Sequence, residues 1–392
     1  MGRGLSGFSP DLWWLTVSLG LFGLGFGLYA VIWPLWVERL GGGPLAIGLI
    51  GTVASVVTAA SVWPGGWLAD RWDRRCLIFW GSALAVPVPL AFAAAHRWTA
   101  LIPGMVVYCA SNFSLPALQA VIVSETAPER LATVYNLIMA AFAVGMTAGP
   151  ALGGALAEWA GFGPVFDLAA ALYLLSALAV LPIRPKPARP RTGLGPVAPI
   201  LSPALRRWLA LASLAALAGG ISGPFVVPYL KMAAHLDLEA IGGMGSLGVL
   251  AATVSGPAWG WAAARWGIPR VMGLGFGLGA FGAVLLLLDP GRAAGLFAAT
   301  FLRGIGEGAR TLGGVAIGRA VDPTQAGRAY GTLNLITEGV GALAPLAGGW
   351  LYARAAWLPL WCGAALTGLL AAGLLAGPPY RWPWSASGPE TG

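Results

Sequence analysis

Three charged residues stand inside one apolar stretch of the sequence, residues 301–314. They are Arg303, Glu307 and Arg310. On a helix that turns about 100° per residue, Glu307 lies about 40° to one side of Arg303 and Arg310 about 20° to the other, so the three share a face. A charge at the centre of a bilayer costs about 2.5–3.5 kcal/mol, which disfavours a lipid-facing position. We expect this face to line a water-filled cavity or meet a partner helix. It either binds an anionic or hydrogen-bonding molecule or forms a self-neutralising structural triad.

The next apolar stretch carries further polar residues. Asn334 and Glu338 are four residues apart and would share a helix face. Glu338 lies about ten residues inside this stretch, deep enough for burial to favour the protonated carboxyl group. We therefore assign proton exchange to Glu338, with Glu307, and binding to Asn334 and to Asn112 of an earlier stretch. The alternative is a buried Glu338 that pairs with an arginine of the preceding stretch.

The composition indicates a membrane protein with many spans. Hydrophobic residues make up 57% of the chain and charged residues 10%, against about 25% charged in soluble domains. The net charge of +8 is spread between apolar stretches, which argues against nucleic-acid binding. The three cysteines, Cys76, Cys109 and Cys362, lack the spacing of metal ligands. We expect no metal and no cofactor.

Twelve stretches approach the length of about 20 apolar residues that crosses a bilayer. The first six are residues 12–37, 44–69, 76–95, 99–124, 131–157 and 161–183, and the second six are 208–230, 240–264, 270–289, 293–318, 328–353 and 356–377. The predicted fold is an all-α membrane protein with twelve transmembrane helices in two six-helix bundles. The predicted domains are residues 1–183, a basic linker at 184–207, residues 208–378 and a tail at 379–392.

Two motifs recur in the second half of the chain. The sequence GGWLADRWDRR at residues 65–75 has a degraded copy, WGWAAARWGIPR, that begins at Trp259, and five of seven positions match at an offset of 194. Pro150, Gly153 and Gly154 likewise correspond to Pro345, Gly348 and Gly349 at an offset of 195. The chain therefore reads as two parallel repeats. In membrane chains such repeats are typical of transporters, which bind substrate between the halves.

The first motif carries a family resemblance. Residues 66–75 resemble the G-x-L-A-D-R-x-G-R-[KR] signature of the major facilitator superfamily, with Asp73 at the position of the second glycine. The resemblance implies a cytoplasmic gate in which charge-assisted hydrogen bonds hold a helix of the other half. The expected gate residues are Gly66, Asp70, Arg71, Arg74, Arg75 and, in the second copy, Arg265. The simpler alternative is a charge cluster that anchors the turn at the membrane surface.

The second motif resembles a signature of the antiporter branch of that superfamily, GPxxGG. It lies in a predicted span and would give one helix a smooth face for close packing, with a bend at Pro150. The expected packing hinge comprises Gly145, Gly149, Pro150, Gly153 and Gly154 and, in the second copy, Pro345, Gly348 and Gly349. The longer family pattern has a glycine where this chain has Asn136.

The resemblance implies a secondary active transporter that works by alternating access. We expect proton-coupled efflux, by antiport, of small organic molecules such as drugs or metabolites. The alternative is uptake or uniport of a small metabolite, including an anionic one. The membrane arginine that the antiporters carry in the fourth span is absent here. Subtracting 195 from Arg303 and Glu307 gives Tyr108 and Asn112.

Other classes of protein fit the sequence poorly. A membrane enzyme would need a nucleophile, an acid–base pair or metal ligands near one interface, and His96 and His235 lie in separate predicted loops. A receptor without transport would have no cavity between the halves. The basic linker and the positive-inside rule place both termini in the cytoplasm. We expect a monomer in the cell inner membrane, with the lipid bilayer, a small molecule and protons as its partners.

Overall fold

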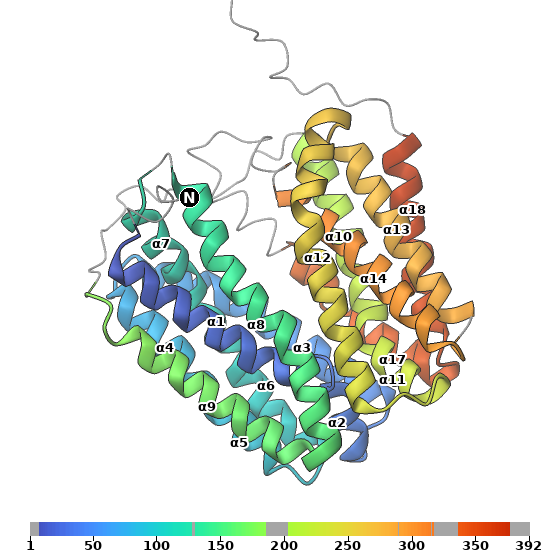
Figure 1. Ribbon diagram of the computed structural model, residues 1–392, viewed down its shortest axis with the longest axis horizontal. Coiled ribbons are helices and arrows are strands. Elements are labelled where there is room, and N and C mark those ends of the chain that lie inside the picture. Colours follow the sequence, from blue (N-terminus) through green and yellow to red (C-terminus); the bar gives the residue numbers. More distant parts are fainter. Residues whose placement is uncertain are drawn as a thin grey trace, which may run out of the picture.

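Helices make up the protein throughout the described part of the computed structural model, which comprises residues 8–127, 130–185, 203–288, 290–314, 316 and 336–376 (Figure 1). Ten helical segments in this part are long and apolar enough to cross a membrane. The predicted tenth and eleventh spans are not among them. The tenth corresponds to α14, which carries three charged residues, and much of the eleventh lies outside the described residues.

The N-terminal half contains the first six predicted spans. Its helices are α1 (Pro10–Ala30), α2 (Trp33–Arg39), α3 (Pro44–Ala69), α4 (Arg74–Ala85), α5 (Pro87–Ala93), η1 (Trp98–Ala100), α6 (Leu101–Ala110), η2 (Ser111–Ser114), α7 (Leu115–Glu125), α8 (Leu131–Ala160) and α9 (Phe162–Val180). Prolines explain several breaks within spans. Pro34, Pro87 and Pro116 each lie in the first turn of a helix, where their missing N–H leaves no hydrogen bond unmade.

The C-terminal half follows the same order. Its helices are α10 (Pro203–Ser222), η4 (Gly223–Phe225), α11 (Val226–Ala233), α12 (Leu238–Trp266), α13 (Ile268–Leu288), α14 (Ala293–Arg310), α17 (Ala344–Arg354) and α18 (Leu358–Ala376). A further helical segment covers residues 336–341. The described helices of the two halves therefore correspond to the predicted spans in order.

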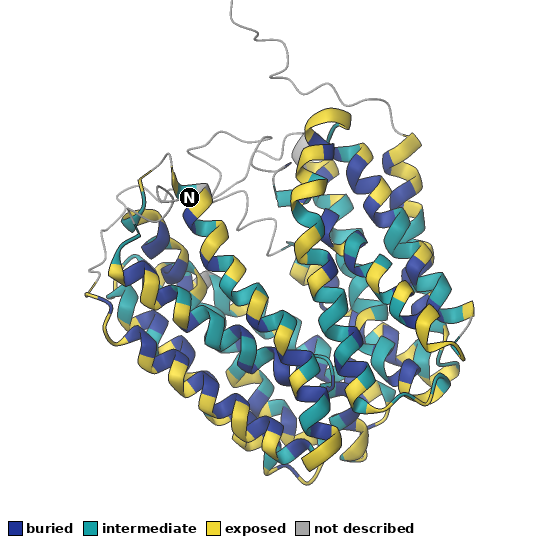
Figure 2. Cartoon of the chain, viewed as in Figure 1, coloured by how far each residue is buried: buried dark blue, intermediate teal, exposed yellow. Residues whose placement is uncertain are grey.

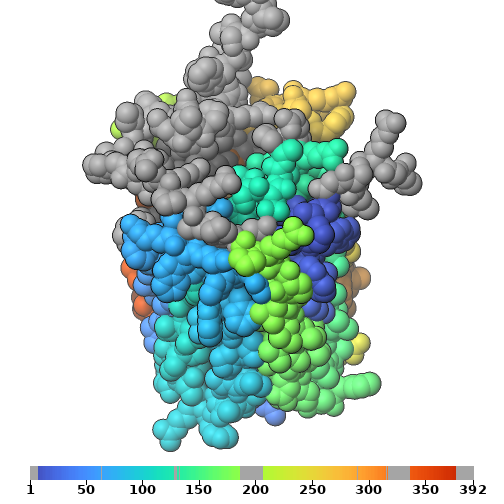
Figure 3. All heavy atoms as spheres, turned by 90° about the vertical axis from the view of Figure 1, so that its left-hand side faces the viewer, coloured from blue at the N-terminus to red at the C-terminus, as the bar shows by residue number. Residues whose placement is uncertain are grey.

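Many large apolar residues of the helix bundle are exposed. Figure 2 shows exposed positions along many of the helices. Figure 3 looks onto the outward surface of the N-terminal half, where α4 and α9 lie side by side. Trp80 on α4 and Leu174, Leu175 and Leu178 on α9 are each about half exposed. Such a surface would aggregate in water but matches the hydrocarbon of a bilayer.

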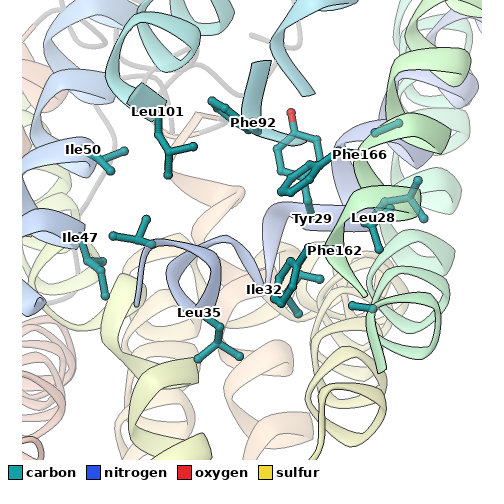
Figure 4. Close-up of a cluster of buried hydrophobic side chains, with 14 of the residues drawn as sticks. Leu28, Tyr29, Ile32, Leu35, Ile47, Ile50, Phe92, Leu101, Phe162 and Phe166 are labelled. Atoms are coloured by element: carbon teal, nitrogen blue, oxygen red, sulfur yellow. The ribbon is translucent and has the colours of Figure 1, made fainter. Parts of the chain in front are cut away.

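The buried side chains show where the halves meet. One cluster joins residues of both halves, including Ile32 and Ile47 from the first and Phe225 and Ile241 from the second. Figure 4 labels members of this cluster from the first half, among them Ile32 and Ile47. The cluster lies at the end of the molecule where α8 ends and α12 begins, which we call the closed end (bottom of Figure 1). The clusters toward the opposite end each belong to a single half. Among the described residues, the shared core of the two halves therefore lies at the closed end.

Two matching helix pairs connect the halves, α8 with α12 and α17 with α3. In the first pair the Pro150 carbonyl packs against Gly242, and in the second the Pro345 carbonyl packs against Gly48. A Cβ atom at Gly48 would lie 2.5 Å from the Pro345 oxygen, and one at Gly242 would overlap the Pro150 oxygen. Gly48 and Gly242 differ by 194 in number, so the two contacts are equivalent in the repeat.

The glycines of the GPxxGG motif divide between two neighbours. Gly145, Gly149 and Gly153 pack against the backbone of α1 within the same half, whereas Gly154 packs against α12 of the other half. The second copy does the same, because Gly348 meets α10 of its own half and Gly349 meets α3 of the other.

Within the part of the chain that the structure describes, two hydrogen bonds also join the halves. The backbone N–H of Ala151 donates to the Ser246 hydroxyl over 2.8 Å, and the backbone N–H of Leu238 donates to the Glu158 carboxylate over 2.8 Å. Leu238 opens α12, so Glu158 places a negative charge at the positive end of that helix dipole.

Replacing Gly242 by valine should separate α12 from α8 at the closed end, because the new side chain has no space beside Pro150. We expect a cysteine at position 246, in a chain without its native cysteines, to react several times faster with a membrane-impermeant maleimide. Gly243→Val is the matched control, since a Cβ at Gly243 meets nothing within 4 Å. Equal labelling rates in the two variants would contradict the importance of this contact.

Candidate functional site

A cavity of about 500 Å³ lies inside the C-terminal half. Its walls come from α10, α11, α12, α13, α14 and α18, and among the described residues the N-terminal half contributes Val31. Most lining residues are small or apolar. The charged lining residues are Arg303, Glu307 and Arg310, the three that the sequence placed on one helix face. The structure therefore brings this predicted set together on a cavity wall.

Glycine packing on two sides orients α14. Gly304 packs against Gly248 and Ala251 of α12, and Gly306 packs against Gly275 and Gly279 of α13. The remaining face of α14 carries Arg303, Glu307 and Arg310 and lines the cavity.

A carbonyl contact fixes the same turn of α14. The Trp259 indole N–H of α12 donates to the Ile305 carbonyl oxygen over 2.8 Å. Close contact on both flanks and this hydrogen bond hold the charged face in one orientation.

The charges on α14 are not equally paired. Arg310 Nη1 lies 2.9 Å from Glu307 Oε1 and 3.1 Å from Oε2, so both oxygens of the carboxylate bind one nitrogen. Arg303 lies close enough to Glu307 to be attracted by it, yet it forms no hydrogen bond or ion pair within the described part of the chain. The predicted triad is thus one ion pair with a second, separate cation.

The structure places two of the other predicted binding and proton-exchange residues, Glu338 and Asn112, and neither lines the cavity. Glu338 is on the helical segment 336–341, exposed, and close enough to Arg310 to interact electrostatically. Asn112 lies on η2 of the N-terminal half, where its amide donates to the Cys109 carbonyl oxygen over 3.1 Å, and it is not a lining residue of the cavity. Asn334 lies outside the described residues.

Hydroxyl groups of the cavity wall were missed from the sequence. Ser222, Thr253 and Thr367 line the cavity and each donates to a carbonyl oxygen of its own helix, over 2.9, 2.9 and 2.7 Å. Thr300 lies one turn before Arg303 on α14 and also lines the cavity. Isolated hydroxyls in apolar helices are common, so only the folded arrangement distinguishes these four.

The equivalent space in the N-terminal half is filled with aromatic rings. Tyr108, which corresponds to Arg303 in the repeat, stacks on Phe26 with ring centroids 5.5 Å apart. It also stacks on Tyr173, whose hydroxyl lies 2.8 Å from that of Tyr29. The repeat therefore has a charged cavity in one half and an aromatic core in the other.

The expected gate residues bind within their own half. Arg71 lies over the Trp67 ring at 4.2 Å, Arg74 donates to the Ala69 carbonyl oxygen over 3.4 Å, and Arg75 donates to that of Leu181. In the second copy Arg265 lies over the Trp261 ring at 4.5 Å. Asp70 is the C-cap of α3, and a Cβ at Gly66 would meet nothing within 4 Å. In this conformation the hydrogen bonds and ring contacts of these four arginines stay within their own half.

Asp73 explains the departure from the gate motif. Its side chain accepts a hydrogen bond of 2.8 Å from the backbone N–H of Arg75 and so caps the start of α4. The family signature has a glycine at this position, whereas this chain has an aspartate that serves as the N-cap of α4.

Comparison with known families agrees with this architecture. The sequence pattern of the Major Facilitator Superfamily matches residues 15–222 and again residues 208–390. The chain belongs to the major facilitator superfamily. The resemblance seen in the sequence is confirmed, and so are the all-α fold and the assignment to transporters and not enzymes.

Proteins similar to this transporter in sequence or in fold bear names that refer to different substrates. A protein of Deinococcus radiodurans named "Putative sugar efflux transporter" is 30% identical over 201 residues, which is 48% of this chain and 51% of the relative. The aligned region thus spans about half of that relative. A crystal structure of the nucleoside transporter NupG has a TM-score of 0.78 at 15% identity and covers 93% of this chain and 99% of its own. The peptide transporter POT in complex with sulfate has a TM-score of 0.77 at 16% identity, with 95% of both chains covered.

Breaking the ion pair of α14 one partner at a time should destabilise the transporter. Glu307→Gln removes the carboxylate beside Arg303 and Arg310. Arg310→Gln removes the ion-pair partner of Glu307 and leaves Arg303 as the arginine of α14 next to that carboxylate. We expect each single variant to lose about 1 kcal/mol, a small value because both side chains are partly exposed. The double variant should recover part of this loss. Thermal unfolding of the purified protein, with Arg270→Gln as a control outside the cavity, measures the effect; strictly additive losses would contradict the pair.

Proposed function

We propose that this transporter exports a small hydroxylated organic molecule, of the size of a sugar, in exchange for protons across the cell inner membrane. The observation that carries the proposal is the cavity in the C-terminal half, with charged and hydroxyl side chains on an otherwise apolar wall. A cavity of about 500 Å³ falls within the usual range for small-molecule sites.

Two independent features favour a hydroxylated substrate. The hydroxyls of Ser222, Thr253 and Thr367 have donated their hydrogens within their own helices, so their oxygens remain free to accept hydrogen bonds from a ligand. The relative from Deinococcus radiodurans bears the name of a sugar efflux transporter.

We assign this conformation to the inward-facing step of alternating access. The shared core and both glycine contacts lie at the closed end, which is the outer end if both termini are cytoplasmic. Structures titled as inward-facing occur among the neighbours, including a bacterial homologue of the iron transporter ferroportin with a TM-score of 0.74 and a homologue of Spinster with a TM-score of 0.71.

The gate and the hinge then have defined roles in the cycle. In the outward-facing step the turn at residues 66–75 would meet the other half, and Asp70 and its arginines would exchange their present contacts for bonds across the interface. The glycines of α8 and α17 would act as the surfaces on which the halves rock. Gly154 and Gly349 lose their cross-half neighbours in that motion, whereas Gly153 and Gly348 keep theirs.

Glu338 is the proposed proton carrier, with Glu307 as a second candidate. Both carboxylates interact with Arg310, so protonation of either would weaken its hold on that arginine and alter the cavity wall. Proton binding and substrate binding would then compete for one cluster of charges, as exchange requires.

Everted vesicles that are acid inside test this assignment. We expect a transported sugar to release protons from vesicles that contain the protein, and Glu338→Gln to abolish this release while exchange of labelled substrate across the membrane continues. Asp167→Asn, an exposed carboxylate on α9 remote from the cavity, should behave as the parent protein. Substrate movement in the parent without any proton flux would instead favour uniport or uptake.

A further inference from the structure

We propose that the substrate carries an anionic group, a carboxylate or a phosphate, and that Arg303 binds it inside the cavity. This inference rests on the proposed function, because it names the chemical class of the molecule that the same cavity would transport. It goes further by assigning the charge of the substrate and the residue that selects it.

The charge balance of the wall is the first argument. Among the described residues, the cavity is lined by two arginines and one glutamate, which leaves an excess of one positive charge in that set. Both oxygens of Glu307 bind Arg310, and Glu338 also acts on Arg310. Arg303 is therefore the cation whose charge the wall neutralises least.

The chemistry of a guanidinium group is the second argument. It has five N–H donors and no acceptor, and a carboxylate or phosphate can bind it through two parallel hydrogen bonds. Arg303 forms none with the described residues, although a charge at this depth in a membrane is costly unless it is paired or hydrated. An anionic group on the substrate would supply the missing partner.

Packing of its aliphatic stem fixes the position of the Arg303 side chain before a ligand binds. Its Cγ atom lies 2.9 Å from where a Cβ of Gly282 would be, so the absence of a side chain on α13 makes room for its stem. Gly279 and Ala283 of the same helix line the cavity beside it. A cation whose stem is packed in this way loses little freedom on binding, which favours selection by charge.

The hydroxyl oxygens of the wall complete the assignment. They come from α10, α12 and α18, whereas Arg303 comes from α14, so acceptors and cation stand on different walls of one cavity. A ligand that matches this arrangement has an acid group at one position and hydroxyl groups elsewhere. Sugar acids and sugar phosphates have this chemistry, whereas neutral sugars lack the acid and amino sugars carry the opposite charge.

Binding to the purified, full-length protein distinguishes these ligands. Calorimetry with glucose, gluconate, glucose 6-phosphate and glucosamine should give the tightest binding for one of the two acids. Arg303→Gln should weaken binding of that acid by about tenfold or more, because a charge-assisted hydrogen bond is lost. The affinity for glucose should stay unchanged. Arg303→Lys should restore part of the affinity for the acid, and Arg270→Gln should have no effect.

The possible failures separate the two proposals. If glucose binds and is transported as well as the acids, and Arg303→Gln alters neither, the anionic substrate is refuted and sugar export stands. If the folded parent protein neither binds nor transports any of the four compounds, both proposals fail. Tighter binding of glucosamine than of either acid would refute both the anionic substrate and the role of Arg303, while sugar export would stand.

Discussion

Close contact between helix backbones at glycine is the constraint on which the rest of this structure depends. Two such contacts join the halves, Pro150 of α8 against Gly242 of α12 and Pro345 of α17 against Gly48 of α3. Each brings the backbones of two helices, one from each half, together without an intervening side chain. Such contacts gain dispersion energy along the helix and lose no side-chain entropy, yet they involve few directional bonds. Helix pairs of this kind can hold the closed end of a transporter and still come apart.

The same packing principle builds the cavity. Glycines on both flanks of α14 draw it close to α12 and α13, which leaves only one face for Arg303, Glu307 and Arg310. In the N-terminal half the equivalent positions belong to an aromatic cluster around Tyr108 and Tyr173. The duplication thus preserved the packing scaffold while the two interiors diverged, one becoming a charged cavity and the other a rigid core.

This divergence bears on how transport would work. Stacked rings pack the interior of the N-terminal half, whereas the charged groups of the C-terminal half line a cavity and have room to rearrange. Among the described residues, the hydrogen bonds across the interface, such as the one from Leu238 to Glu158, lie toward the closed end. Arg71, Arg74 and Arg75 instead make their contacts within their own half, with the Trp67 ring and with backbone carbonyls.

The sequence by itself determined the order of the helices, the repeat and the shared face of the three charges, because each depends on periodicity or on spacing along one chain. It also contained the equivalence of Gly48 and Gly242, although one sequence does not say which glycines meet. Only the tertiary structure decided that Glu307 pairs with Arg310 and not Arg303, that Asn112 stands outside the cavity, and that Asp73 caps α4. Those outcomes depend on distances of a few ångströms between side chains and neighbouring helices, and helical spacing alone does not specify such distances.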